Sequence, residues 1–186
     1  ASAAAVILLL ISAGVGWHFW NKYQNAMVFS HFEEQLNQFK ENQIQTEKLP
    51  AHDITKKRDQ QQQHFDGILK KIQNNSTLNE PNKNHLIGKL YYYNRLYPEA
   101  VETLQKANHE LSENRALASL YISALSQEYF IILAQNIEDS ALAQQQNTRL
   151  SDATKNIKSR IQDINKRHHF NDHAALPLLS ATEHIL

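Results

Sequence analysis

The chain opens with a long apolar segment that ends in aromatic residues. No charged residue occurs from Ala1 to Trp17, and the run Val6–Ile11 is the most apolar part. About 20 apolar residues are needed for a helix to span a bilayer, and residues 1–20 supply that length. Trp20 and Tyr23 follow where such a helix would leave the bilayer, at an interface that aromatic rings favour. The pattern therefore predicts a single-pass transmembrane anchor over residues 1–20.

Two other interpretations of this segment stay open. A cleaved signal peptide has a shorter apolar region and needs a small-residue cleavage site, which is not evident before Trp17. A buried helix of a soluble protein is the other alternative. The chain begins with Ala1 rather than Met, so we expect further residues upstream. The flank 21–45 is not enriched in Lys or Arg, which favours placing it outside the cytoplasm.

Residues 21–53 are predicted to form a polar helical spacer and a linker. From residue 27 to residue 44 the apolar positions recur at helical spacing and form one stripe. The stripe consists of Phe29, Phe32, Leu36 and Phe39. Residues 47–53 include Pro50 and have the composition of a linker.

The remaining residues, 54–186, are predicted to form an all-α domain, because no alternating strand pattern rises above background. Helical periodicity predicts helices over 54–73, 83–94, 97–111, 114–134 and 149–167, and a last helix that begins near Asp172. Residues 135–148 are ambiguous, with a short helix around 140–146 as one interpretation.

A spaced set of small and large apolar residues stands out within residues 81–114. Counted from Pro81, the set occupies positions 7, 8, 11, 20, 24 and 27, and consists of Ile87, Gly88, Tyr91, Ala100, Leu104 and Ala107. This spacing resembles a tetratricopeptide (TPR) repeat, a helical hairpin of 34 residues. Small residues at Gly88 and Ala100 would let two antiparallel helices approach closely. Asn84 and Ser112 depart from the pattern, and an unrelated helical hairpin is the alternative.

One repeat cannot bury its core alone, so we expect neighbouring helices to stack on it. Helix 54–73 is expected on one side of the repeat and helix 114–134 on the other. Residues 172–186 resemble the first helix of another, incomplete repeat, from which we expect the sequence to be truncated at its C-terminus.

The order of anchor, spacer, repeat and incomplete repeat resembles the periplasmic TPR part of cytochrome c maturation proteins. These apocytochrome-chaperone subunits are related to the nitrite-reductase haem-lyase accessory proteins. The matching positions are Ile87, Gly88, Tyr91, Tyr97, Ala100, Ala107, Ala124, Leu125 and the segment Asn171–Ala181. The resemblance covers about residues 65–186 and departs at Ser112, at Pro177 and within 135–148.

This resemblance implies a function in c-type cytochrome biogenesis. The protein would lie in the bacterial inner membrane as a single-pass protein, with its helical domain in the periplasm. It would bind the C-terminal segment of apocytochrome c and present it to the membrane subunits of the haem-ligation complex. A structural scaffold of an inner-membrane complex and a general periplasmic TPR chaperone are the rival hypotheses, because TPR arrays serve many partners.

The same repeat predicts a peptide-binding surface on its first helix. Positions 2, 5, 9, 12 and 13 of the repeat face the groove in TPR arrays. Here they are Asn82, His85, Lys89, Tyr92 and Tyr93. These polar and aromatic side chains suit recognition of a helix or an extended peptide. An ordinary solvated helix face is the alternative.

Composition narrows the chemistry further. The chain has 19 basic residues (Lys and Arg) and 19 acidic residues (Asp and Glu), and this balance of charge argues against a nucleic-acid partner. It has no cysteine, which excludes thiolate metal sites and cysteine catalysis. The sequence has no Gly-rich phosphate loop and no nucleophile elbow. His168, His169 and His173 cluster, but a solvated loop is favoured over a metal or haem site, and Glu138 with Asp139 are interpreted as a surface turn. We therefore predict no enzymatic activity, no metal and no cofactor.

Overall fold

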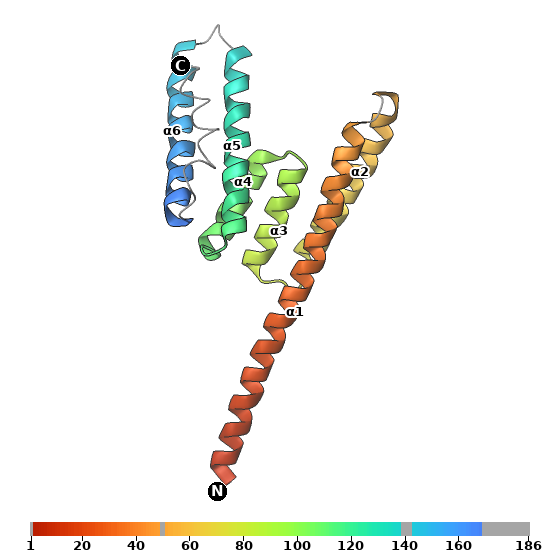
Figure 1. Ribbon diagram of the computed structural model, residues 1–186, viewed down its shortest axis with the longest axis vertical. Coiled ribbons are helices and arrows are strands. Elements are labelled where there is room, and N and C mark those ends of the chain that lie inside the picture. Colours follow the sequence, from red (N-terminus) through yellow and green to blue (C-terminus); the bar gives the residue numbers. More distant parts are fainter. Residues whose placement is uncertain (1, 49–50, 139–142, 169–186) are drawn as a thin grey trace.

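The computed structural model describes the backbone of residues 2–48, 51–138 and 143–168, and the side chains of 12–46, 48, 57–134 and 152–168. These residues form helices joined by short connections and contain no strand, so the predicted all-α fold is confirmed (Figure 1). The described helices are α1 (Ser2–Glu47), α2 (Ala51–Gln73), α3 (Glu80–Tyr93), α4 (Tyr97–Glu110), α5 (Arg115–Glu138) and α6 (Ala143–His168).

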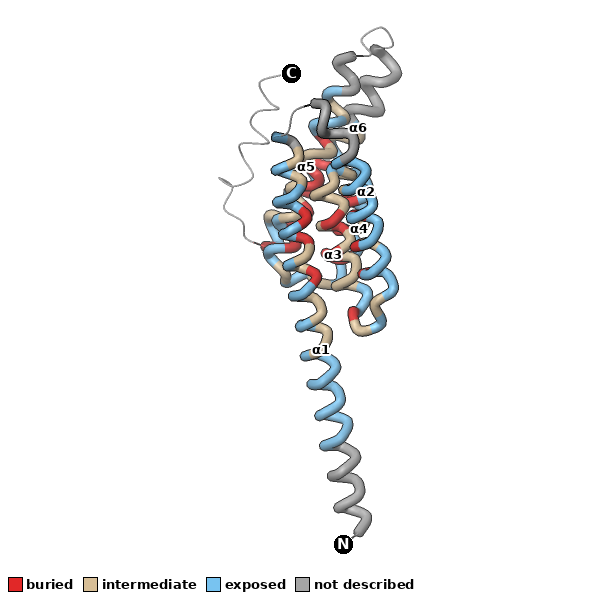
Figure 2. The backbone as a smooth tube through the Cα atoms, turned by 90° about the vertical axis from the view of Figure 1, so that its right-hand side faces the viewer, coloured by how far each residue is buried: buried red, intermediate tan, exposed pale blue. Residues whose placement is uncertain are grey.

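α1 is one long helix with two different environments. Its N-terminal part projects away from the other helices, and residues 12–23 are all exposed there (Figure 2). Trp17, Phe19, Trp20 and Tyr23 are all more than half exposed. The side chains of residues 1–11, which include the most apolar run, lie outside the described residues.

The C-terminal half of α1 packs against α2 and α3. Phe32, Leu36 and Phe39 are buried, which confirms the predicted stripe, and Phe29 is half-buried beside them. Their partners are Phe65, Ile68 and Ile72 of α2, Leu78, and Leu86 and Leu90 of α3. The segment predicted as a spacer thus contributes half of a helical hairpin, because its apolar stripe meets the apolar face of α2.

The connection between α1 and α2 is shorter than the predicted linker 47–53. α1 continues to Glu47 and α2 already begins at Ala51. No helix-breaking residue separates Ala51 from the apolar face of α2, so the helix extends upstream of residue 54, its predicted start.

α3 and α4 form the central hairpin. α3 begins three residues before its predicted start, because the Asn79 side chain caps it by accepting a hydrogen bond from the Asn82 N–H at 3.0 Å. At the centre of the hairpin Gly88 faces Leu104, and a Cβ on Gly88 would lie only 2.6 Å from two carbon atoms of Leu104. Glycine is favoured at this position because an added Cβ would overlap with the side chain of Leu104, and one of the two would have to shift.

α5 and α6 form the third hairpin. Ile157, Ile161 and Ile164 of α6 are buried against α5, and the described helix α6 is longer than the predicted 149–167. On the α5 side the buried residues are Leu117, Ala118, Tyr121, Ala124, Leu125 and Tyr129. The ambiguous stretch 135–148 is divided between the end of α5, the residues 139–142 outside the described set, and the start of α6.

One stretch of the described chain, Arg115–Ala134 in α5, has the length and hydropathy of a membrane span, and 39% of it is buried. Its buried side faces α4 and α6, which is the environment of a helix at the centre of a folded array.

The three hairpins stand side by side in chain order. α3 packs against α1 and α2 on one side and against α4 and α5 on the other, while α6 packs mainly on α5. The first helices of the hairpins, α1, α3 and α5, are thereby brought next to one another (Figure 1). The predicted incomplete repeat 172–186 and the match Asn171–Ala181 lie outside the described residues.

Candidate functional site

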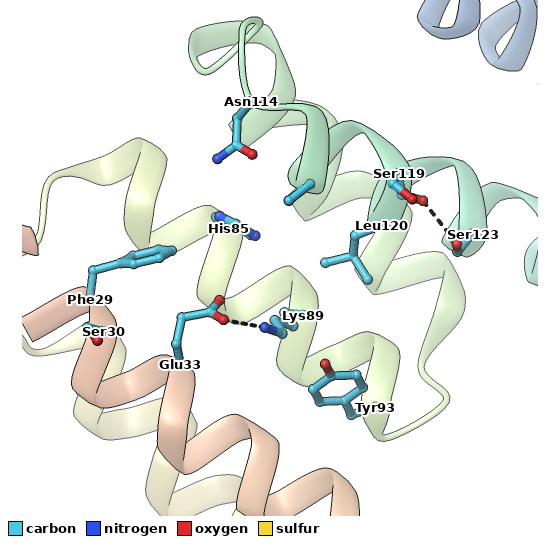
Figure 3. Close-up of a pocket in the computed structure, with 11 residues that line it drawn as sticks. Phe29, Ser30, Glu33, His85, Lys89, Tyr93, Asn114, Ser119, Leu120 and Ser123 are labelled. Carbon is cyan, nitrogen blue, oxygen red and sulfur yellow. Dashed lines mark hydrogen bonds and ion pairs between the residues drawn. The ribbon is translucent and has the colours of Figure 1, made fainter. Parts of the chain in front are cut away.

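A groove of about 650 Å³ lies where the first helices of the three hairpins meet. Each helix contributes one wall, so no single segment of sequence contains the site. Its lining residues are Phe29, Ser30 and Glu33 of α1, His85, Lys89 and Tyr93 of α3, and Asn114, Ala116, Ser119, Leu120 and Ser123 of the third hairpin and the turn before it. Figure 3 shows that side chains from all three walls face a common space.

Three of the five predicted peptide-binding residues line this groove, namely His85, Lys89 and Tyr93. Asn82 lies outside it, where its side-chain amide donates a hydrogen bond to Oδ1 of Asn25. Tyr92 also lies outside the groove, with its ring 5.7 Å from the ring of Tyr97. These two side chains therefore take part in contacts between helices.

Lys89 and Glu33 form an ion pair between α3 and α1 (Figure 3). The Lys89 side chain is 14% exposed and that of Glu33 is 26% exposed, so the pair is largely shielded from water. The Tyr93 ring lies beside this pair, with the Lys89 Nζ atom 5.8 Å from its centroid. Burial, with the nearby Glu33 carboxylate, raises the pKa of Tyr93 to about 12, so its phenol stays neutral. The charges of Glu33 and Lys89 therefore balance each other, and a second cation, the Lys40 Nζ atom, lies 5.6 Å from the centroid of the same Tyr93 ring.

His85 is the most buried polar side chain of the groove, with only 6% of its surface exposed. Its ring lies 5.3 Å from the ring of Phe29, and its Nδ1 atom has no hydrogen-bond partner. Burial lowers the pKa of His85 to about 4, with smaller opposing effects from Glu33, which raises it, and Lys89, which lowers it. His85 is therefore a neutral imidazole at physiological pH.

The α1 and α5 walls of the groove were not predicted from the sequence. Phe29 was identified only as part of an apolar stripe, and Glu33 and Leu120 were not singled out. The available signal was the position of Glu33, which follows the Phe29–Phe32 part of the stripe. A carboxylate beside an apolar stripe indicates a helix edge that can pair with a lysine on a neighbouring helix.

The predicted histidine cluster is only partly described. His168 is 7% exposed at the end of α6, and its carbonyl oxygen accepts a hydrogen bond from Arg115 at 2.9 Å. His169 and His173 lie outside the described residues, as do Asp139 and the side chain of Glu138. Among the residues that the structure describes, no group of three or more His, Cys, Asp or Glu is placed to hold a metal ion.

The charges and burial of the lining side chains define the chemistry of the groove. Its one carboxylate is paired with a lysine, its histidine is neutral and desolvated, and its serine hydroxyls lie among apolar and amide side chains. Such a surface takes up apolar side chains and hydrogen-bonds uncharged groups. No family model, curated protein or solved structure shows significant similarity to the chain.

Proposed function

We propose that the chain is a membrane-anchored peptide-binding protein with a TPR-like array of three hairpins. The observation that carries this proposal is the groove lined by the first helices of three successive hairpins. A stacked helical array with a shared concave face suits the capture of a helix or an extended peptide. No residue pair in the described groove is arranged for acid–base or nucleophilic chemistry, so a binding role fits it better than catalysis.

Two features support the TPR-like assignment. The six spaced positions of residues 81–114 fall on α3 and α4, where Gly88 and Leu104 are in contact and Ala100 and Ala107 are fully buried. The second helix of each of the first two hairpins also packs on the first helix of the next one, α2 on α3 and α4 on α5, as expected for stacked repeats.

The anchor is assigned to residues 1–20. The described part of this segment is helical, and its side chains from Ser12 to Trp20 are exposed, including Val15, Trp17 and Phe19. Large apolar side chains exposed in this way are favoured in an apolar surrounding, which a bilayer supplies. We place the anchor in a bacterial inner membrane and the array in the periplasm, following the family resemblance and the composition of the flank.

The client that we propose is the C-terminal segment of apocytochrome c, held for the membrane subunits of the haem-ligation complex. This identity comes from the sequence resemblance. The groove is compatible with it, because an amphipathic helix can place its apolar side chains between Phe29 and Leu120.

The test is a peptide-binding titration with the full chain in nonionic detergent. A fluorescent peptide from the C-terminal helix of a c-type apocytochrome is compared with an unrelated amphipathic helix of equal length. Ser119→Trp places an indole in the groove, and Ser159→Trp, at an exposed position on α6, is the matched control. We expect micromolar affinity for the cytochrome peptide, which Ser119→Trp weakens by about tenfold or more, a loss of about 1.4 kcal/mol.

Each alternative has its own result in this titration. Equal affinity for both peptides, with the same loss in Ser119→Trp, would indicate a general chaperone. Absence of binding to either peptide would contradict the proposal and favour a scaffold. Equal weakening by Ser119→Trp and Ser159→Trp would show that the peptide binds elsewhere on the chain.

A further inference from the structure

The helix that carries the proposed anchor is the same helix that forms one wall of the groove. α1 runs without interruption from Ser2 to Glu47, and no proline occurs within it. No described loop separates the exposed aromatic residues near Trp20 from the groove residue Phe29. The rise of the α-helix therefore fixes how far the groove lies from the aromatic residues.

The distance between the two features is short. Phe29 follows Trp20 by nine residues, so the groove begins about 14 Å beyond Trp20 along the helix axis, at 1.5 Å per residue. Glu33 lies about 20 Å beyond Trp20 on the same basis. If the aromatic residues mark the bilayer interface, the groove opens directly above the lipid surface.

Contacts close to the interface hold the array at this height. The Asn25 side chain donates a hydrogen bond to the carbonyl oxygen of Thr77 at 3.0 Å and accepts one from the Asn82 amide. Asn25 is only two residues beyond Tyr23, so the connection between α2 and α3 is fixed to α1 just above the interface. The array cannot swing about the anchor without breaking these hydrogen bonds and the contact of Phe29 with His85.

The groove also has a fixed place relative to the anchor. Its α1 wall consists of Phe29, Ser30 and Glu33, which lie within about 20 Å of Trp20 along the helix axis, at 1.5 Å per residue. With α1 spanning the bilayer, this wall stands close to the membrane surface. Among the residues that line the groove, Glu33 and Lys89 pair with each other, Leu120 is partly buried, and Ser30 and Ser119 are exposed.

We propose that the groove holds an amphipathic polypeptide segment close to the membrane surface, with an uncharged face toward α3. This inference rests on the proposed function, because it assumes both the anchor and peptide binding in the groove. It adds the place of the client: a segment beside the bilayer is favoured, whereas a segment held far from the membrane is disfavoured.

The first test measures the height of the array above the lipid. The chain has no cysteine, so Ser119→Cys and Gln62→Cys each give a single labelling site when this chain is placed in nanodiscs. Ser119 lines the groove, as does Glu33, which lies about 20 Å beyond Trp20. Gln62 is next to Gln61, and the Gln61 side chain hydrogen-bonds to Thr46. Thr46 lies about 39 Å beyond Trp20 at 1.5 Å per residue, so Gln62 is farther from the proposed anchor than Ser119. Energy transfer to headgroup-labelled lipid should place the Ser119 label about 20 Å closer to the lipid than the Gln62 label. Equal distances, or a closer Gln62 label, would overturn the proposal.

The second test measures the effect of that height on binding. The cytochrome peptide is attached to a lipid headgroup by a short flexible linker and compared with the same peptide free in solution. We expect at least tenfold tighter binding of the tethered peptide, because the effective concentration near the groove is high. A flexible ten-residue Gly/Ser insertion after Tyr23 serves as the control and should reduce this advantage while leaving free-peptide affinity unchanged.

The two proposals fail in different ways. If free peptide does not bind the full chain in detergent, the proposed function is wrong. If free peptide binds but the labels show no difference in height, or the tether brings no gain, only the membrane-surface proposal is wrong.

Discussion

Gly88→Ala is the most informative single change in the array, because the close approach of α3 and α4 at this position predicts the direction and size of its effect. An alanine Cβ at residue 88 would lie 2.6 Å from both Cγ and Cδ2 of Leu104, and 3.2 Å from the Leu104 backbone nitrogen. Leu104 is fully buried, so its side chain has no solvent-filled space into which to move. The methyl group must therefore push α3 and α4 apart.

Two effects of opposite sign determine the size of the change. Alanine is favoured over glycine in a helix interior by about 1 kcal/mol. Inserting a methyl group into a filled core costs about 1–3 kcal/mol, and the contact with the branch atom of Leu104 favours the upper part of that range. We expect Gly88→Ala to lower the free energy of unfolding by about 1–2 kcal/mol.

Gly67→Ala is the matched control. Gly67 lies in α2, is exposed, and an added Cβ there would meet nothing within 4 Å. The same substitution should therefore raise the free energy of unfolding, by about 0.5–1 kcal/mol.

The assay is urea unfolding of the full chain in nonionic detergent, followed by circular dichroism at about 222 nm, with the slope of the transition checked for each variant. Leu104→Ala completes a double-mutant cycle, because it removes the two side-chain carbon atoms that would lie 2.6 Å from the added Cβ. In that background Gly88→Ala should become neutral or stabilising, which gives a coupling energy of about 2 kcal/mol. A stabilising effect of Gly88→Ala in the otherwise unchanged chain would refute the close approach of α3 and α4.

Three further predictions concern the contacts around the groove. Asn25→Ala and Asn82→Ala should each lower the free energy of unfolding in urea titrations by about 1–2 kcal/mol, and the double variant should lose less than their sum, since they share one hydrogen bond. The pKa of His85 is about 4 in the folded chain, below its unfolded value of 6.5. The neutral His85 therefore contributes fully to the free energy of unfolding above pH 6.5, and this contribution is lost as the pH falls towards 4. His85→Phe should reduce the acid-induced loss of unfolding free energy by at most about 3 kcal/mol. Parallel plots of unfolding free energy against pH for the two chains would contradict this prediction. Lys89→Met leaves the Glu33 carboxylate unpaired and should cost about 1–3 kcal/mol, whereas adding Glu33→Gln should restore part of the loss; no restoration would count against the pair.

The sequence was sufficient to predict contacts between residues that are close along the chain. Gly88 and Leu104 are 16 positions apart, and the spacing of small and large residues indicated how their helices meet. The apolar stripe through Phe32 and Leu36 likewise predicted which face of its helix is buried. Periodicity carries this information because it reflects the geometry of one helix or one hairpin.

The groove could not be predicted in full, because it depends on residues that are far apart in sequence. Glu33 and Lys89 are separated by 56 positions, and nothing in either local pattern identifies the other as its partner. His85 was expected to face a ligand, yet Phe29 of α1 packs on its ring. The helix that carries Phe29 was interpreted as a spacer, since an amphipathic helix does not reveal from its own sequence what covers it.

The arrangement of the hairpins in a row has a consequence for how the protein unfolds. α3 has neighbours on both sides, whereas α6 packs mainly on α5. In a one-dimensional stack, stability is a sum of units and their shared interfaces, so the end unit opens at a lower free energy than the middle. Amide hydrogens of α6 should therefore exchange with solvent first and those of α3 last. The array would then unfold from its α6 end while the α1 end remains folded.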